Sequence, residues 1–191
     1  QQYIGFLQAT TKNPLFCCAL ILRHMPIVKD IRIRTIQKND DPALATIIRS
    51  TLKEFGANKP GTVYYDPTTD ALYELFASTA SSVYFVAELE DELVGGGGIF
   101  PSPGLPNDTC ELVKMYLLPQ VRGIGLGKKI IEACIAFAKD AGFKNIYIET
   151  MPELKQAMKT YEKFGFYYLD GPMGETGHFG CELWMLKKLE E

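Results

Sequence analysis

Residues 111–141 read ELVKMYLLPQVRGIGLGKKIIEACIAFAKDA, and this stretch decides the fold of the chain. The part before Pro119 is mostly bulky and apolar, and it stops at the proline because proline cannot donate to a sheet ladder. Glycines follow at alternate positions, Gly123, Gly125 and Gly127, and apolar residues then recur at helical spacing as far as Ala141. The stretch therefore predicts a strand, a glycine-rich turn and a helix.

The predicted turn stands where the helix begins, and free amide groups and the positive end of the helix dipole meet at such a point. These residues favour a site for an anion such as a pyrophosphate. The P-loop motif does not fit, because Arg122 stands where its first glycine is required and Lys129 where its magnesium-binding hydroxyl is required. The dinucleotide-binding fingerprint does not fit either, because its third glycine would fall on Lys128.

The pattern that fits is R-x-x-G-x-G, which begins at Arg122 and ends at Gly127. An overlapping match, Q-x-x-G-x-G, begins at Gln120, and the Arg122 frame is preferred for its distance from Pro119. The pattern resembles the acetyl-CoA-binding motif of the GNAT superfamily of acyl-CoA-dependent N-acetyltransferases. A glycine-rich turn that binds no ligand is the alternative, and the strand before it and the helix after it favour the motif.

A second stretch, residues 157–166, reads AMKTYEKFGF and resembles the A-x-x-x-Y-E-K-x-G-F signature of the same family. The chain departs from the family at Leu154, where many relatives carry an asparagine that contacts the cofactor arm. The resemblance covers roughly residues 27–188. It implies an α/β fold in which a mixed, mostly antiparallel sheet contains a central parallel βαβ unit and carries helices on both faces.

Periodicity and turn residues place the other elements along the chain. The predicted strands, besides the one before Pro119, are residues 31–36, 83–89, 93–100, 145–150, 166–168 and 181–186. Asp41 and Pro42 predict the N-cap and first turn of a helix that ends near Gly56. A long loop, residues 57–70, and a short helix through residues 72–76 follow.

Two local signals predict finer features. Thr150 and Glu153 have the spacing of a capping box, which predicts that the last helix begins there, and Gly165 predicts its end. Four consecutive glycines, residues 95–98, weaken a strand and predict a bulge or a close approach of the backbone.

Composition indicates one globular domain of ordinary size, with 191 residues, 47% hydrophobic and 23% charged. We expect this domain to span residues 25–191 and residues 1–24 to be an N-terminal extension; a packed extra element is the alternative for that segment. A formal charge of −3 without a long basic cluster gives no electrostatic footprint for nucleic acid. The apolar run at residues 14–22 is too short to span a membrane.

The five cysteines are odd in number and lack C-x-x-C pairs, and His24 and His178 are the only histidines. Neither a disulfide framework nor a metal site is expected, and the reduced cytoplasm is the natural compartment. The expected partner is a small-molecule or protein amine, with no nucleic acid and no membrane. The family resemblance also implies that a homodimer is common.

The resemblance implies how acetyl-CoA, the co-substrate, is held. Its pyrophosphate rests on the backbone amides of the turn, which are those of Arg122, Gly123, Ile124, Gly125, Leu126, Gly127 and Lys128. The strand backbone of Tyr116, Leu117 and Leu118 meets the pantetheine arm, and one amide there polarises the thioester oxygen. Little of this binding depends on side chains.

Acetyl transfer to an amine needs a neutral nucleophile and a proton donor for the departing thiolate. Tyr161 aligns with the family tyrosine that acts as general acid, and its phenol is protonated at neutral pH; a core tyrosine is the alternative. Glu111, near the start of the motif strand, is the expected base, with a surface carboxylate as the alternative. His178 is the other titratable candidate near neutral pH.

The acceptor site is expected to include Tyr64, Tyr65 and Asp66 of the long loop, and His178 of a glycine-rich loop near the C-terminus. The expected function is transfer of an acetyl group from acetyl-CoA to a primary amine by direct attack on the thioester, without a metal. A catalytically silent acyl-CoA-binding sensor or interaction module is the alternative, and Tyr161 favours the enzyme.

Overall fold

The computed structural model describes residues 30–174, 176–177 and 179–189. The expected domain boundary between residues 24 and 25 and the candidate His178 therefore lie outside the described residues. Among the helices of the described part, none combines the length and the apolar character that crossing a bilayer requires.

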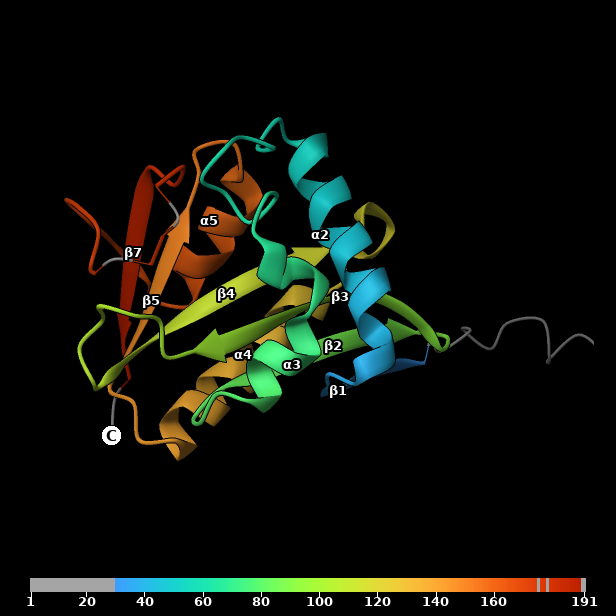
Figure 1. The fold of residues 1–191 in the computed structure, drawn as a ribbon, viewed down its shortest axis with the longest axis horizontal. Helices are drawn as coiled ribbons and strands as arrows, with labels where there is room; N and C mark the ends of the chain where they lie inside the picture. Colours follow the sequence, from blue (N-terminus) through green and yellow to red (C-terminus); the bar gives the residue numbers. More distant parts are fainter. Residues whose placement is uncertain (1–29, 175, 178, 190–191) are drawn as a thin grey trace, which may run out of the picture.

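The described residues form a seven-stranded sheet in the order β1-β2-β3-β4-β5-β7-β6 (Figure 1). Its strands are β1 (Ile31–Thr35), β2 (Val83–Leu89), β3 (Glu92–Phe100), β4 (Thr109–Leu117), β5 (Asn145–Thr150), β6 (Tyr167–Leu169) and β7 (Leu183–Lys188). Strands β4 and β5 pair in parallel, and the other neighbours pair antiparallel. The predicted sheet, mostly antiparallel with a central parallel βαβ unit, is confirmed.

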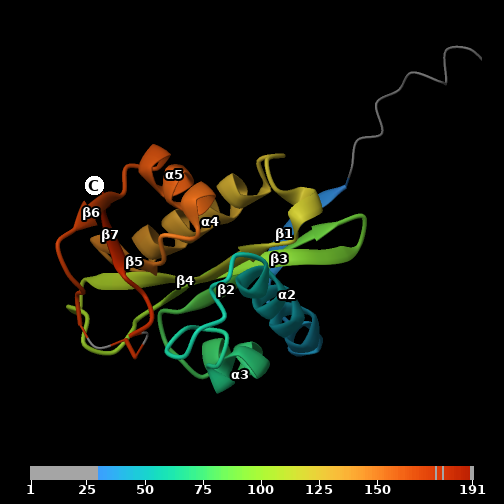
Figure 2. The ribbon, with the colours of Figure 1, turned by 90° about the horizontal axis from the view of Figure 1, so that it is seen from above.

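Helices cover both faces of this sheet, as the sequence predicts (Figure 2). On one face lie α2 (Asp41–Glu54) and α3 (Leu72–Ala77), and on the other lie α4 (Leu126–Asp140) and α5 (Lys155–Lys163). Short 3₁₀ helices precede three of them: η2 (Lys38–Asp40), η3 (Pro67–Asp70) and η4 (Pro119–Val121). Each pair of helices buries its apolar residues against the sheet, so the core consists of two clusters, one on each side.

Helix α2 begins one residue away from the predicted point. Asp40 is its N-cap and Asp41 its first helical residue. The Asp40 carboxylate accepts hydrogen bonds from the Arg34 guanidinium at 2.7 Å and 2.9 Å and from the amide of Gln37 at 2.7 Å. The Asp41 carboxylate accepts one from the amide of Tyr73 at 2.9 Å, which ties α3 to the start of α2. A tertiary partner therefore takes the Asp41 carboxylate, which local spacing assigned to capping.

The capping box predicted at Thr150 and Glu153 is wrong. Thr150 still belongs to β5, where it pairs with Leu183 of β7, and α5 begins only at Lys155. The Glu153 carboxylate accepts a hydrogen bond at 2.5 Å from the ammonium of Lys59, in the loop after α2. Strand pairing and a distant ion pair therefore override the local spacing.

The four glycines of β3 produce both features that the sequence predicts. The pairing of β3 with β4 changes register between Gly96 and Gly98, which is a β-bulge. A Cβ atom on Gly95 would lie 2.3 Å from the carbonyl oxygen of Tyr116, so the backbones of the two strands approach closely there. The last two strands, β6 and β7, begin one and two residues later than predicted.

Candidate active site

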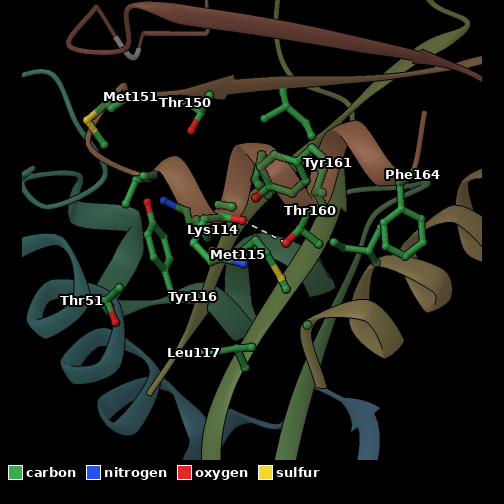
Figure 3. Close-up of a pocket in the computed structure, with 18 of the residues that line it drawn as sticks. Thr51, Lys114, Met115, Tyr116, Leu117, Thr150, Met151, Thr160, Tyr161 and Phe164 are labelled. Carbon is green, nitrogen blue, oxygen red and sulfur yellow. Dashed lines mark hydrogen bonds between the residues drawn. The ribbon is translucent and has the colours of Figure 1, made fainter. Parts of the chain in front are cut away.

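Strands β4 and β5 pair only over the first three residues of each strand. Their pairing runs from Thr109 with Asn145 to Glu111 with Tyr147, although β4 continues to Leu117 and β5 to Thr150. A cavity of about 750 Å³ opens at this point, and residues of both strands, of α4 and of α5 line it (Figure 3). The edge of β4 beyond Glu111 lacks β5 as a ladder partner, so an extended ligand chain has backbone to pair with there.

The glycine-rich turn lies at one end of this cavity and leads into α4. Gly123 and Gly125 have φ angles of +81° and +89°, in the left-handed region that favours glycine. Gly125 is the N-cap of α4, and within the described residues no side-chain hydrogen bond caps this helix. The first amides of α4 therefore lie uncapped at the positive end of its dipole, which is the arrangement that binds an anion.

The residues of the turn divide between the cavity and the core. Within the turn, the predicted cofactor residues that line the cavity are Arg122, Gly123, Gly125, Gly127 and Lys128. The Leu126 side chain is buried in the core, whereas Ile124 is exposed at the surface. A Cβ atom on Gly127 would lie 3.3 Å from Leu117, so this glycine lets the start of α4 approach β4.

Arg122 uses its side chain to support the turn. Its guanidinium donates to the Glu54 carboxylate at 2.7 Å and 2.8 Å, and its Nε donates to the carbonyl of Leu117 at 2.9 Å. It also lies over the ring of Phe55, 5.1 Å from the centroid. These contacts join the end of β4 to the end of α2.

Tyr116 and Leu117, two of the three strand residues predicted to meet the pantetheine, line the cavity along β4. Leu118 is engaged elsewhere. Its amide donates to the carbonyl of Val94 at 2.9 Å, and its carbonyl accepts from the amide of Val121 at 3.2 Å. Its side chain packs against the core cluster under α4. The Leu118 amide is therefore already used by the sheet.

Tyr161 belongs to both the core and the cavity. It lies on α5 and is 6% exposed, and its ring packs against that of Phe166 with centroids 5.8 Å apart. It also lines the cavity, on the side opposite Met115 and Leu117 of β4 (Figure 3). Burial raises the pKa of the Tyr161 phenol above its usual value, so the hydroxyl stays protonated at neutral pH.

Glu111 is buried, with 3% of its surface exposed. It is the last residue of β4 that pairs with β5, and its carboxylate accepts a hydrogen bond from the hydroxyl of Ser102. It lines the large cavity and also a second cavity of about 420 Å³. Glu111 therefore lies where the two cavities adjoin.

Two of the three acceptor candidates in the long loop line a cavity, and the third packs in the core. Tyr65 and Asp66 line the second cavity, and Tyr65 is 60% exposed at its rim. Tyr64 packs against the core cluster under α2 and α3, and its carbonyl accepts a hydrogen bond from Arg49 at 3.2 Å. Thr176 and Gly177, from the loop between β6 and β7, also line this cavity.

Lys114 is a site residue that the sequence analysis missed. It is buried in β4 and lines both cavities. Its ammonium donates to the Asp66 carboxylate at 2.5 Å and lies 3.5 Å from the hydroxyl of Thr69. Burial lowers the pKa of Lys114, and the hydrogen bond to Asp66 opposes that shift. A lysine among the apolar residues of a predicted strand is the signal that would have drawn attention to it.

Cys181 also lines the large cavity. Burial, followed by the charges of Glu149 and Glu111, raises the pKa of its thiol to about 12. The thiol is therefore protonated and weakly nucleophilic at neutral pH. Across residues 30–174, 176–177 and 179–189, no group of three or more His, Cys, Asp or Glu side chains is arranged to hold a metal ion.

Comparison with known sequences gives a consistent result. The sequence profile of the Acetyltransferase (GNAT) family matches residues 47–166. A protein of Escherichia coli K12, named uncharacterized N-acetyltransferase YjgM, is 45% identical over 159 residues, which cover 82% of this chain and 94% of that protein. Human N-acetyltransferase 8 is 30% identical over 118 residues, which cover 59% of this chain and 52% of that protein, about half of its length.

Solved structures show the same fold. A GNAT-family acetyltransferase from Staphylococcus aureus Mu50 superposes with a TM-score of 0.74 at 20% identity, covering 84% of this chain and all 100% of that chain. The PaiA N-acetyltransferase of Thermoplasma acidophilum, in complex with coenzyme A, gives 0.66 at 20% identity and covers 83% and 99%. YncA of Salmonella typhimurium, with acetyl-CoA, gives 0.65 at 19% identity and covers 85% and 95%.

Proposed function

We propose that this chain, which belongs to the GNAT family of acetyltransferases, transfers an acetyl group from acetyl-CoA to a primary amine by direct attack on the thioester. The observation that carries the proposal is the combination of an uncapped helix start with a strand edge that opens into the same cavity. The first binds an anion and the second binds an extended chain, and coenzyme A offers both in that order along one molecule.

The backbone of this chain supplies the groups that acetyl-CoA needs. Amides from Arg122 to Lys128 hold the pyrophosphate, and Tyr116 and Leu117 face the pantetheine arm. Two solved relatives in fold are complexes with coenzyme A and acetyl-CoA, which supports this choice of ligand. Leu154 lines the cavity with an apolar side chain, so the pantetheine finds no amide side chain at that position.

Glu111 acts as the general base and Tyr161 as the general acid of the acetyl transfer. An amine with an ordinary pKa is protonated at neutral pH, and Glu111 accepts that proton, directly or through water, so that the nitrogen becomes a nucleophile. The new bond joins the amine nitrogen to the acetyl carbonyl carbon while the carbon–sulfur bond breaks. Tyr161 donates a proton to the departing sulfur, and its raised pKa keeps that proton in place until then. The nitrogen loses a second proton as the amide forms; this proton passes to water, and the Tyr161 phenolate takes one back from water.

Direct attack is favoured over an acetylated enzyme intermediate. Cys181 is a thiol that lines the large cavity, and its pKa of about 12 leaves almost no thiolate at neutral pH. The second cavity meets the large one at Glu111, so an amine bound there reaches the thioester without a carrier.

An amine panel with a thiol-release assay tests the proposed function. The panel contains butylamine, phenethylamine, lysine, spermidine and a peptide with a free N-terminus, each mixed with acetyl-CoA and the full chain. We expect release of CoA that matches the acetylated product for at least one class. Binding of acetyl-CoA by calorimetry without turnover of any amine would instead favour the silent acyl-CoA-binding module.

A further inference from the structure

Two of the four glycines of β3, Gly96 and Gly98, leave room for one aromatic ring. A Cβ atom on Gly96 would lie 2.6 Å from the ring of Tyr84, and one on Gly98 would lie 2.8 Å from it. Side chains at these two positions would collide with the ring, because real Cβ atoms do not approach other heavy atoms so closely. Tyr84 pairs with Gly98 on the neighbouring strand, so its ring lies across β3 toward β4.

The Tyr84 hydroxyl reaches past β3 to the backbone of β4. It donates a hydrogen bond of 2.9 Å to the carbonyl oxygen of Lys114, in a buried position. Tyr84 itself is 1% exposed, and burial raises the pKa of its phenol well above the usual value, so the donor proton is always present. Without this hydroxyl the Lys114 carbonyl would lose a buried partner.

Lys114 is the residue at which β4 bulges. It has a φ angle of +51°, in the left-handed region that a lysine rarely adopts, and the register of β3 and β4 shifts beside it. Such a conformation persists only where surrounding contacts hold it. Tyr84 holds the carbonyl of Lys114, and Asp66 holds its ammonium at 2.5 Å.

The hydrogen bond from Tyr84 also sets the direction of the next amide. A peptide unit is planar and trans, so the N–H of Met115 points opposite to the carbonyl of Lys114. Tyr84 belongs to the core cluster under α2 and α3, whereas Met115 packs against the cluster under α4 and lines the large cavity. The Met115 amide therefore points away from Tyr84, toward the side of the sheet that carries α4.

We propose that Tyr84 is a positioning residue for acetyl transfer: by holding the Lys114 carbonyl across the glycines of β3, it aims the Met115 amide at the thioester oxygen of acetyl-CoA. This inference rests on the proposed function and deepens it, because it names the amide and the group that orients it. A hydrogen-bond donor polarises a carbonyl only when its N–H is correctly oriented. Loss of the hydrogen bond from Tyr84 to the Lys114 carbonyl should therefore reduce polarisation of the thioester carbonyl by the Met115 amide.

The test uses Tyr84→Phe, which keeps the ring and deletes only the hydroxyl. Isotope-edited infrared spectroscopy measures the carbonyl stretch of acetyl-CoA labelled with ¹³C at the acetyl carbonyl. Binding to the unaltered chain should lower this frequency below that of free acetyl-CoA, and Tyr84→Phe should return it toward the free value. Calorimetry should show little change in acetyl-CoA affinity, because the pyrophosphate site is intact.

Val86→Ala is the matched control. Val86 is fully buried, two residues along the same strand and in the same core cluster, and its truncation costs stability without touching Lys114. We expect the control to lower the melting temperature and to leave the carbonyl frequency at the value of the unaltered chain. An equal frequency change in Val86→Ala would show that loss of stability alone moves the band, and it would overturn the proposal.

Two further outcomes would also overturn it. A carbonyl frequency that is the same in Tyr84→Phe and in the unaltered chain, with acetyl-CoA bound to both, would remove Tyr84 from the mechanism and leave the proposed function standing. Failure of acetyl-CoA to bind the unaltered chain would contradict both the role of Tyr84 and the proposed function. As a second measurement on the unaltered chain, the amide proton of Met115 should move downfield in NMR spectra when acetyl-CoA binds, and an unmoved resonance would contradict the assignment.

Discussion

The large cavity, proposed to hold the cofactor, and the second cavity, proposed to hold the acceptor, are built in different ways. Although β5 and α5 also line the large cavity, the residues proposed to hold acetyl-CoA there lie in one continuous segment, from Tyr116 to Lys128, and the proposed contacts are mainly to its backbone. The second cavity is lined by separate segments: the loop after α2, helix α3, the end of β3 and the loop after it, strand β4 and the loop after β6. Under the proposed function, local backbone geometry would determine cofactor binding, and tertiary assembly would determine acceptor binding.

The largest effect is expected where backbone geometry is destroyed. Gly125→Glu forces a side chain onto a φ of +89° and adds a negative charge beside the phosphates, so acetyl-CoA affinity should fall by at least roughly 100-fold. Calorimetry measures this loss. Gly142→Glu is the matched control: Gly142 has a φ of +86° just beyond the other end of α4, and it too has open space around it. Equal acetyl-CoA affinities in the two folded variants would contradict cofactor binding by the backbone of the turn.

A smaller effect on turnover, without loss of binding, is expected at Tyr161. Tyr161→Phe keeps the packing against Phe166 and deletes the proton donor, so kcat should fall by roughly ten- to a thousand-fold while acetyl-CoA affinity changes little. Tyr168→Phe, on the exposed strand β6, controls for the loss of a phenol. An unchanged kcat, where chemistry limits turnover, would leave Tyr161 as a core residue only.

Glu111→Gln should have an effect that depends on pH. The free amine is scarce well below its pKa of about 10, so loss of the base should lower activity by about tenfold or more near pH 7. As pH rises, free amine becomes abundant and the variant should approach the unaltered chain. A pH profile of kcat/KM measures this, and His178→Ala should keep the shape of the profile. Loss of the acidic limb in the histidine variant alone would reverse the assignment.

Cys181→Ala should have the smallest effect. The thiol lines the cavity but is protonated, with a pKa of about 12, so its removal should leave kcat/KM within about twofold of the unaltered value. Mass spectrometry after incubation with acetyl-CoA alone should find no acetylated protein. A large loss of activity, or a stable acetyl group on Cys181, would replace direct attack by a carrier mechanism.

Features built from one contiguous segment could be predicted from the sequence, whereas features assembled from distant segments could not. The turn, the strand before it and the helix after it are contiguous, so these three elements together predict an anion site from the sequence. Lys114 and Asp66 form their ion pair across 48 positions of sequence, and no local pattern announces it. The capping box at Thr150 failed for a related reason, because β5 pairs with β7 through that residue and Lys59 takes Glu153.

Hydrogen bonds to distant parts of the chain also decided features that the sequence left open or predicted differently. Glu111 looked equally suited to the surface and to catalysis, and only the fold buries it beside Ser102 at the junction of the cavities. Leu118 was expected to offer backbone to the pantetheine, but its amide donates to Val94. In both cases the partner comes from a different strand or loop, which spacing along the chain does not show.

The most direct test of the central claim is an NMR titration of the ¹⁵N-labelled chain with coenzyme A. If backbone groups of the turn hold the pyrophosphate, the largest amide shifts should fall on residues 123–128, with a second group on β4 at Met115, Tyr116 and Leu117. Shifts that concentrate instead around the second cavity, at Tyr65 and Ser102, or amides of the turn that do not move at saturation, would contradict the claim.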